Sequence, residues 1–430
     1  MAEICEAYVE GLAFGGAAFG RLPDGMLCFV RGAIPGERIR LEVTVRKKSY
    51  ARGRLREILE GSPQRIPPAC PLAVTPQNAG CDCQGCSYQH LPYDLELTWK
   101  QRQFEGFLLR PGLVSPERML PPFPAPERYH WRNRIALSCT TPSAGVPVLG
   151  YRAEDNKTIL PVSSCMIARK ALDAAIRGIS DCAGTEKGKF IVISGKKTLI
   201  PADTRRVFFR WTLKDGVTVW TDQDPPSGVM LTEQLGSAGR FLVPRESFFQ
   251  TNTAVACELL SRTAATVREL QPEAVLELFC GAGIFSIVAA ESCGNCTCFG
   301  IELDRRAISA ARRNAERRGL GKRCRFHCGD ASSFRSVFFP GGHRNPPDSD
   351  KILLILDPPR SGLTKRQMEE ILSLRSGHIL YISCSPDTLK RDLESLTAPG
   401  NNRYEIVQTG ILDMFPATAH FESMTLLRRT

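Results

Sequence analysis

The sequence predicts an α/β protein in which a doubly wound parallel sheet follows an OB-like β-barrel and a mixed α/β region. Three observations predict it. From about residue 240, apolar strand-like segments alternate with helical ones; the first 60 residues contain short strands separated by glycines; and a Pro- and Cys-rich segment separates the two. The chain has 430 residues, too many for one core. We therefore expect three domains, at residues 1–60, 61–235 and 236–430.

The barrel is predicted most clearly by "RIRLEVTVRKK", in which apolar residues from Ile39 to Val45 alternate with polar ones, as in a strand with one buried face. A basic run follows, formed by Arg46, Lys47, Lys48, Arg52, Arg54 and Arg56. It suits a phosphate backbone, although a solvated rim explains it equally well. The net charge of +11 favours a polyanionic partner without distinguishing RNA from DNA or from an acidic membrane surface.

The chain shows no sign of membrane insertion or secretion. Its longest nearly apolar window, residues 278–290, is shorter than the roughly 20 residues of a membrane span, and "MAEICEAYVEGL" lacks the features of a signal peptide. An odd number of cysteines, 17, in such a chain favours reduced thiols, metal ligands or catalysis over disulfides. We expect a cytoplasmic protein that makes no membrane contact.

The second region contains a cysteine cluster. The cysteines of "CPLAVTPQNAGCDCQGCSYQH", together with one in "VSSCMI", are Cys70, Cys81, Cys83, Cys86 and Cys165. Four thiolates suit zinc or an iron–sulfur cluster. Zinc ribbons usually have two tight pairs and only one is evident here, so the spacing leans toward iron–sulfur and leaves zinc, or no metal, open. Elsewhere in this region we expect strands in "RIALSC", "PVLGY" and "KFIVISG" and a helix near residues 167–179.

The third region reads as a parallel sheet covered on both faces, because "AVLELFC", "CFGIE", "KILLILD" and "HILYISC" lack alternating polarity. Ligands of such sheets bind beyond the carboxyl ends of the strands. The residues predicted to follow or end those strands are Gly281, Glu302, Asp357 and Cys384.

The motif "ELFCGAGIFS" is a strand, a Gly-x-Gly turn and a helix start, which lets the backbone approach a nucleotide-like ligand. Glu302, at the end of the next strand, is placed to accept hydrogen bonds from a ribose, although it also suits an ordinary surface acid. Ser286 occupies the position where a dinucleotide site has a third glycine. This favours S-adenosylmethionine over NAD.

The motif "LDPPRSG" ends another strand, and its two prolines hold Asp357 rigidly; a Pro-rich turn with a capping Asp is the alternative. Methylases that act on exocyclic amines carry an aromatic residue where Arg360 stands. The loop also lacks the second cysteine of the RNA cytosine-C5 methylases.

"YISCSP" places Cys384 at a strand end, with Ser385 as a possible N-cap and Pro386 at the first helical position, so we expect the helix N-terminus to stabilise its thiolate. A thiolate that adds to C6 of uracil makes C5 nucleophilic toward an activated methyl group. A general base must then remove the C5 proton. The alternative is an ordinary buried cysteine.

Six motifs, "FFQTN", "LFCGAG", "GIE", "LDPPRSG", "YISCSP" and "DMFPATAHFE", resemble those of the RNA uracil-C5 (5-methyluridine) methyltransferases. "GERIRLEVTVRKKSYARGRL" resembles a TRAM domain, a small RNA-binding barrel. Together with the cysteines, the resemblance is to the iron–sulfur branch that modifies 23S ribosomal RNA, and it covers nearly the whole chain. It implies a class I S-adenosylmethionine methyltransferase domain, an RNA partner and a monomer.

The resemblance also implies residue roles. Cys384 would be the nucleophile and Glu422 the base. The residues that would line the site for S-adenosylmethionine and the target base are Gln250, Phe279, Glu302, Asp330 and Asp357. The ligands of a [4Fe-4S] cluster would be Cys70, Cys83, Cys86 and Cys165. Twelve residues separate Cys70 from Cys83, where the family has a short gap, so Cys81 competes with Cys83.

Alternatives in function are a tRNA methylase and an RNA-binding protein without turnover. Cytosine-C5 methylation would require a loop cysteine near Arg360, which the chain lacks. An oxidoreductase would require the third glycine, which is also absent.

Overall fold

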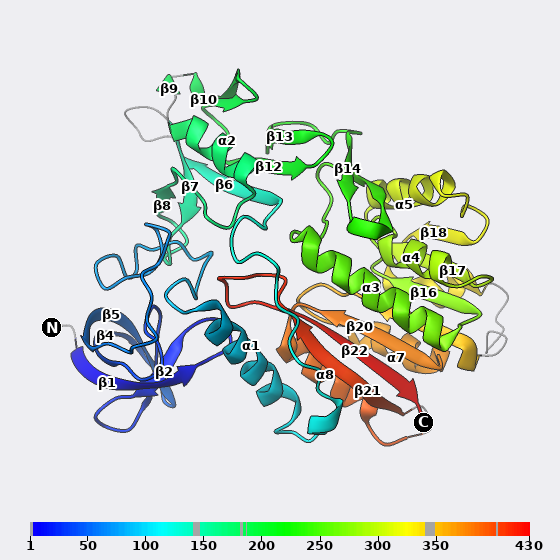
Figure 1. Cartoon of the computed structure of the whole chain (residues 1–430), viewed down its shortest axis with the longest axis horizontal. Helices are drawn as coiled ribbons and strands as arrows, with labels where there is room; N and C mark the ends of the chain where they lie inside the picture. The colour runs from blue at the N-terminus through cyan, green and yellow to red at the C-terminus, as the bar shows by residue number, and fades with distance from the viewer. Residues whose placement is uncertain (1–2, 141–146, 181–183, 186, 340–348, 401–402) are drawn as a thin grey trace.

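The computed structural model describes residues 3–140, 147–180, 184–185, 187–339, 349–400 and 403–430 (Figure 1). It confirms a barrel at the N-terminus and a doubly wound sheet at the C-terminus, with a mixed α/β region between them. The expected domain boundary after residue 235 falls inside a two-stranded hairpin of β14 (Met230–Gln234) and β15 (Arg240–Pro244), so the boundaries stay predictions.

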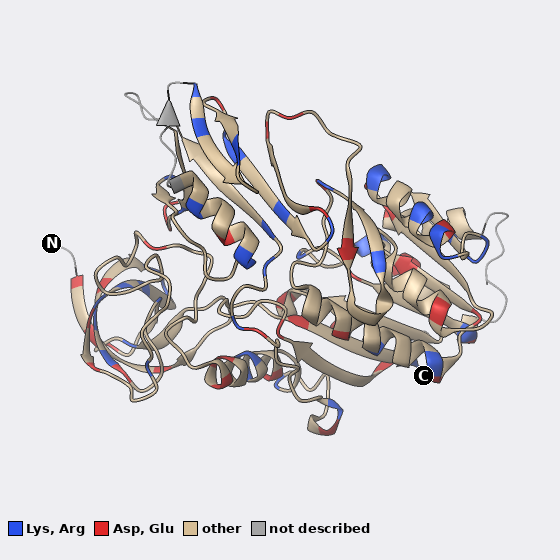
Figure 2. Ribbon diagram, turned by 45° about the horizontal axis from the view of Figure 1, so that its top comes forward, with Lys and Arg blue, Asp and Glu red and all other residues tan. Residues whose placement is uncertain are grey.

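Five strands close the barrel in the order β1-β2-β3-β5-β4. They are β1 (Glu3–Leu12), β2 (Ala18–Arg21), β3 (Leu27–Val30), β4 (Arg38–Arg46) and β5 (Tyr50–Glu60). Ile39 and Leu41 of β4 are buried inside, as their alternation predicts, whereas Val45 is exposed. Acidic and basic residues are interspersed over the strands (Figure 2), and several pair: Arg46 bonds Asp24 at 2.7 Å and Arg40 bonds Glu6 at 3.2 Å.

Helix α1 (Tyr93–Leu108) connects the barrel to the C-terminal sheet. Its Gln103 side chain donates to the backbone carbonyl of Leu12 in the barrel, at 3.1 Å. Its Phe104 and Leu108 pack in the core on one face of the sheet. The cysteine-rich segment that precedes α1, residues 61–92, contains no helix or strand.

The central region contains a five-stranded sheet, β13-β12-β6-β7-β8, and a three-stranded sheet, β11-β10-β9. The expected helix is α2 (Lys170–Ser180), which packs on the larger sheet. The strands are β6 (Arg134–Thr140), β7 (Val148–Arg152), β8 (Ile159–Pro161), β9 (Gly184–Thr185), β10 (Gly188–Ile193), β11 (Lys196–Pro201), β12 (Arg206–Thr212) and β13 (Gly216–Thr221).

The C-terminal sheet has seven strands in the order β18-β17-β16-β19-β20-β22-β21. Its strands are β16 (Ala274–Leu278), β17 (Thr297–Glu302), β18 (Cys324–Cys328), β19 (Ile352–Leu356), β20 (His378–Ser383), β21 (Tyr404–Leu412) and β22 (Glu422–Arg429). The first five in spatial order are parallel, whereas β22 runs antiparallel between β20 and β21.

Helices cover both faces of this sheet (Figure 1). They are α3 (Thr253–Leu270), α4 (Ile284–Ser292), α5 (Arg305–Arg317), α6 (Phe334–Phe338), α7 (Lys365–Leu374) and α8 (Pro386–Thr397). In β19, Leu353 and Ile355 face a core with α3, α4 and α5, whereas Leu354 and Leu356 face a core with α1, α7 and α8. This is why the strand is apolar at every position. Within the described residues, no helix is both long and apolar enough to cross a membrane.

Candidate functional site

The carboxyl ends of the parallel strands bring the predicted residues to one edge of the sheet. Glu302 ends β17, Phe279 follows β16, Asp357 follows β19 and Cys384 follows β20. Because β22 is antiparallel, its first residue, Glu422, lies at this same edge. Neighbouring strands are about 4.8 Å apart, so these side chains form one row along the sheet.

Cys384 and Glu422 are neighbours in this row. Ser383 of β20 pairs with Ser423 of β22. Cys384 follows Ser383 and Glu422 precedes Ser423, so both lie just beyond this pair at the edge of the sheet. Cys384 is half-buried, and Glu422 is 4% exposed. Within the described residues, Oε1 of Glu422 is buried without a hydrogen-bond partner. A buried oxygen without a partner is costly, and it is typical of a site that a ligand completes.

The pKa of the Cys384 thiol differs from the expectation. Burial, with the nearby Glu422 carboxyl, raises this pKa to about 12, although Arg360 opposes the rise. The prediction that the helix N-terminus stabilises a thiolate is therefore wrong for the ligand-free protein. Ser385 makes no side-chain cap to α8, and burial outweighs the helix end.

The neighbouring acids also hold their protons. Burial, with a contribution from Glu302, raises the pKa of the half-buried Asp357 to about 7. Burial and then Asp357 raise the pKa of Glu422 well above its usual range, while Arg360 opposes them. Cys384, Asp357 and Glu422 therefore each favour the protonated form more than the same groups in water do, until a ligand changes their surroundings.

A tight turn next to this row leaves room for a ligand. Phe279, Gly281 and Gly283 all have positive φ, at 65°, 50° and 76°. A Cβ at Gly283 would meet the ring of Phe326 at 2.7 Å, so glycine is required there, whereas the space in front of Gly281 is open. Glu302 accepts a hydrogen bond from the backbone N–H of Gly281 at 3.2 Å. Strained backbone of this kind is concentrated at binding sites.

Glu277 is a residue of this turn that sequence reasoning missed. It is buried in β16, and its carboxyl accepts hydrogen bonds from the backbone N–H, at 2.8 Å, and the hydroxyl of Ser286. Burial raises its pKa to about 8. These bonds hold the start of α4 against the strand. The signal was an acid inside an otherwise apolar strand, next to the glycine turn.

Two predicted residues lie further from the thiol. Gln250 is buried in the loop before α3, where its backbone carbonyl accepts from Asn133 Nδ2 at 3.1 Å. In the same loop, Asn252 Nδ2 donates to the carbonyl of Met414 at 3.3 Å, which ties the loop to the segment leading to Glu422. Asp330 is exposed beyond the outermost strand, where it caps a 3₁₀ turn by accepting from Ser332 N–H at 2.7 Å.

The loop of residues 413–421, which leads into Glu422, is fixed by buried charges. Lys100 of α1 is fully buried, and its Nζ donates to Glu96 at 2.7 Å and to Asp413 at 2.8 Å. The backbone N–H of Ala417 donates to Glu96 at 2.7 Å. We name Lys100, Glu96 and Asp413 the lysine triad. It anchors the loop to α1, and sequence reasoning missed it.

The same loop is bound to the cysteine-rich segment. The backbone N–H groups of Ser87 and Tyr88 both donate to the carbonyl of Ala417, each at 3.0 Å. Ala417 itself has a φ of 65°. Cys86 immediately precedes Ser87. A change in the position of Cys86 can therefore be transmitted to the loop through Ser87 and Tyr88.

Four of the cysteines lie around one small apolar cavity. Cys70, Cys83, Cys86 and Cys165 line it, whereas Cys81 is exposed and does not. Burial raises the pKa of Cys86, and the other three thiols raise it further, so all four are close together. Within the described residues, no group of three or more His, Cys, Asp or Glu side chains is arranged to hold a metal ion. The cavity therefore brings together the predicted thiols, with Cys83 in place of Cys81, without preformed metal-binding geometry.

Known protein families match three parts of the chain. Residues 3–55 match a TRAM domain, residues 275–342 a methyltransferase domain, and residues 348–430 the family described as tRNA (Uracil-5-)-methyltransferase. The TRAM match coincides with the barrel, and the other two cover most of the C-terminal sheet. The family matches therefore support the barrel and the C-terminal sheet separately.

Individual proteins match nearly the whole length. The chain is 30% identical to 23S rRNA (uracil(1939)-C(5))-methyltransferase RlmD of Acidithiobacillus ferrooxidans, over 99% of this chain and 97% of that protein. It is 26% identical to an uncharacterized RNA methyltransferase of Halalkalibacterium halodurans, over 99% and 97%. The crystal structure of the Pyrococcus abyssi tRNA (uracil-54, C5)-methyltransferase in complex with S-adenosyl-L-homocysteine superposes with a TM-score of 0.70 at 24% identity, covering 98% of this chain and all of that one.

Proposed function

Because this chain belongs to the RNA uracil-C5 methyltransferase family, we propose that it transfers a methyl group from S-adenosylmethionine to C5 of a uridine in structured RNA, through a covalent Cys384–uracil adduct. The observation that carries the proposal is the pairing of Ser383 with Ser423. It sets a thiol beside a buried carboxyl that has an unpartnered oxygen, which is the pair of groups that addition and proton removal require.

The reaction follows from these two side chains. The Cys384 thiol gives up its proton to solvent as its sulfur forms a bond to C6 of uracil, and the electron pair of the C5–C6 double bond moves toward C5. When bound, S-adenosylmethionine supplies the methyl group that C5 takes. Glu422, which must be ionised in the loaded site, then removes the proton from C5. The C5–C6 double bond re-forms, and the bond between Sγ and C6 breaks with its electron pair returning to the sulfur. Because the target C6 is inaccessible within a stacked helix, the uridine must be flipped out of the RNA.

The raised pKa of Cys384 places a requirement on the start of the reaction. The thiol must lose its proton as it attacks, and Arg360 is the group at this edge whose charge favours the thiolate. A cationic ligand beside Asp357 and Glu422 would lower the pKa of all three groups. We therefore expect the nucleophile to become active only in the loaded site.

The remaining predicted residues fit a cofactor and a base. The open turn at Gly281, with Phe279 and Glu302 beside it, suits the nucleoside and the ribose hydroxyls, and Asp330 suits the outer end of the same ligand. Asp357, close to the thiol, suits the polar edge of uracil, and Gln250, in the buried loop before α3, is a further candidate for it. These roles are proposals that substitutions can test one at a time.

We infer that the RNA is 23S ribosomal RNA. This is supported by the full-length likeness to a protein named for that substrate. A tRNA is the alternative, since the superposed archaeal structure is titled as a tRNA enzyme. Mapping 5-methyluridine in ribosomal and transfer RNA from cells with and without the gene separates the two.

We also propose that Cys70, Cys83, Cys86 and Cys165 hold a [4Fe-4S] cluster. Their fit rests on four thiols around one apolar cavity, which suits a thiolate-bound cluster. When bound, such a cluster would cross-link residues 70–86 to the loop between β8 and α2 in the central region. Iron and acid-labile sulfide analysis of anaerobically purified protein tests this: Cys83→Ala should lose both, and Cys81→Ala should keep them. Stoichiometric zinc in place of iron would contradict the proposal.

The catalytic proposal is tested by methyl transfer from labelled S-adenosylmethionine to a uridine-containing ribosomal RNA fragment. Cys384→Ala should remove turnover, while Cys257→Ala, which removes a half-buried thiol on α3, should keep it. Full activity of Cys384→Ala would refute the mechanism. Absence of labelling by the wild-type protein with any RNA would favour a binding protein without turnover.

A further inference from the structure

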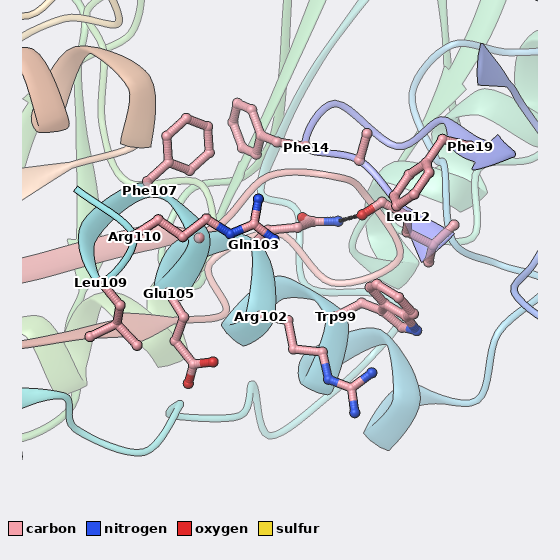
Figure 3. Close-up of a pocket in the computed structure, with 12 residues that line it drawn as sticks. Leu12, Phe14, Phe19, Trp99, Arg102, Gln103, Glu105, Phe107, Leu109 and Arg110 are labelled. Atoms are coloured by element: carbon pink, nitrogen blue, oxygen red, sulfur yellow. Dashed lines mark hydrogen bonds between the residues drawn. The ribbon is translucent and has the colours of Figure 1, made fainter. Parts of the chain in front are cut away.

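A pocket of about 650 Å³ lies between the loop that joins β1 to β2 and helix α1 (Figure 3). Its aromatic lining comes from Phe14 and Phe19 of the barrel and from Trp99 and Phe107 of α1. Arg102 and Arg110 of α1 also line it. Its volume is within the range of small-molecule and nucleotide sites.

The two arginines of this pocket differ from those on the barrel. Within the described residues, neither Arg102 nor Arg110 has a carboxylate at ion-pairing distance, and both are exposed. The guanidinium of Arg102 lies 5.2 Å from the ring centre of Trp99. The acid among the lining residues, Glu105, accepts a hydrogen bond from Gln101 at 3.0 Å. The pocket therefore combines aromatic faces with two cations available to an anion.

Phe14 connects the lining of the pocket to the 413–421 loop through its contacts with the rings of His420, at 6.3 Å, and Phe421. The ring of Phe14 lies 5.6 Å from that of Phe107 in the pocket and 5.8 Å from that of Phe421. Phe421 immediately precedes Glu422. The pocket thus lies close in space to the segment that carries Glu422, near enough for a nucleotide that flanks the target base to reach it.

We propose that the pocket binds an unpaired nucleotide that flanks the target uridine, its base stacked on the aromatic side chains and its phosphates near Arg102 and Arg110. The inference rests on the proposed function, whose RNA substrate it specifies as single-stranded next to the target. Stacking on aromatic faces with arginines along the backbone is how proteins hold unpaired RNA. A purely apolar occupant would not use the two unpaired guanidinium groups.

The test is a cycle of protein and RNA changes, with the KM for RNA measured in methyl transfer by the full-length protein. Trp99→Ala should raise KM by about 5- to 150-fold, because stacking on one aromatic residue contributes about 1–3 kcal/mol. The value of kcat at saturating RNA should be unchanged. An abasic nucleotide at the flanking position should raise KM for the wild type similarly, and Trp99→Ala should add nothing further with that RNA.

The charged part is tested by salt dependence of RNA binding. The double variant Arg102→Ala/Arg110→Ala should lower the slope of log affinity against log salt by about 1–2. The matched control Arg268→Ala removes an exposed arginine at the end of α3, on the opposite edge of the sheet, and should lower it by much less. Because both arginines are exposed, this variant tests the inference even where Trp99→Ala unfolds.

The failure of this inference is distinguishable from failure of the proposed function. If the wild-type protein methylates RNA but the variants have the same KM and salt slope as the wild type, the proposed role of the pocket is wrong. It is also wrong if the increase in KM caused by Trp99→Ala adds in full to the increase caused by an abasic nucleotide at every position tested. Direct binding of the same RNAs, measured by fluorescence anisotropy, reports on the pocket even if no methyl group is transferred.

Discussion

Two groups of buried acids lie on either side of the 413–421 loop and differ in how their charge is balanced. In the lysine triad, Glu96 and Asp413 each lie within 2.8 Å of the Lys100 ammonium. At the sheet edge, no Lys, Arg or His in the described part of the chain forms an ion pair with Asp357 or Glu422. One group is complete within the protein, and the other is incomplete.

The difference separates structural charge from functional charge. A buried ion pair that is fully bonded fixes a segment in one arrangement, and removing one partner is costly. Buried acids without partners destabilise the fold and are retained where a substrate needs them. By this criterion the lysine triad holds the loop, and Asp357 and Glu422 are the acids that we expect to act in the proposed reaction.

The largest expected effect comes from breaking the triad. Lys100→Met should destabilise the protein by about 3–5 kcal/mol, because it leaves Asp413 buried without a cation and leaves Glu96 with only Arg128, at 3.2 Å. Chemical denaturation measures this. Lys365→Met, at an exposed lysine on α7 that is 3.9 Å from Glu369, is the control and should change stability by less than about 0.5 kcal/mol. A small effect of Lys100→Met would remove the distinction drawn above.

Glu422→Gln should show the opposite pattern. We expect turnover to fall by about 10²- to 10⁴-fold and a protein–RNA adduct to accumulate, because the C5 proton is no longer removed. Stability should change by about 1 kcal/mol or less, since the raised pKa of Glu422 keeps the native side chain neutral, as glutamine is. Denaturing gel electrophoresis with labelled RNA detects the adduct.

Glu405→Gln, which changes a half-buried glutamate that is ion-paired with Arg428 on the neighbouring strand, serves as the control for Glu422→Gln and should form no adduct beyond the wild-type level. Rapid release of methylated RNA by Glu422→Gln would assign the base to another residue.

The smallest expected effect is a pH-dependent gain in stability for Asp357→Asn. The pKa of Asp357 is raised from 3.8 to about 7, so its contribution to stability is present below about pH 4 and is lost as pH rises through 7. The stability of the variant relative to the wild type should therefore increase between about pH 5 and pH 8. We expect an increase of only about 1 kcal/mol, because the Asp357 side chain is partly exposed to solvent. Thermal unfolding across this range measures it, and a gain that shrinks with rising pH would contradict the assignment.

The sequence allowed the edge of the sheet to be predicted where local patterns determine it. Apolar segments followed by a glycine turn, by Asp-Pro-Pro or by Cys-Ser-Pro predicted the ends of β16, β19 and β20, and the structure places them side by side. The antiparallel return of β22 depends on long-range pairing, so Glu422 was known only through the resemblance. The cavity likewise favours Cys83 over Cys81, which spacing left open.

The missed features have no local signal. Lys100 lies in a helix with polar and charged neighbours, where a lysine normally faces solvent, and it becomes buried only because the 413–421 loop covers it. The thiolate prediction failed for a related reason, since burial of Cys384 depends on the strand placed beside it. Each depends on tertiary packing that one segment of sequence does not encode.

The carbonyl of Ala417, which accepts two N–H groups from Ser87 and Tyr88, has a mechanical consequence. These two bonds hold the cysteine-rich segment to the 413–421 loop, only five residues ahead of Glu422. We therefore expect oxidation of these thiols to disturb the position of Glu422 through this contact, without modifying a reacting atom.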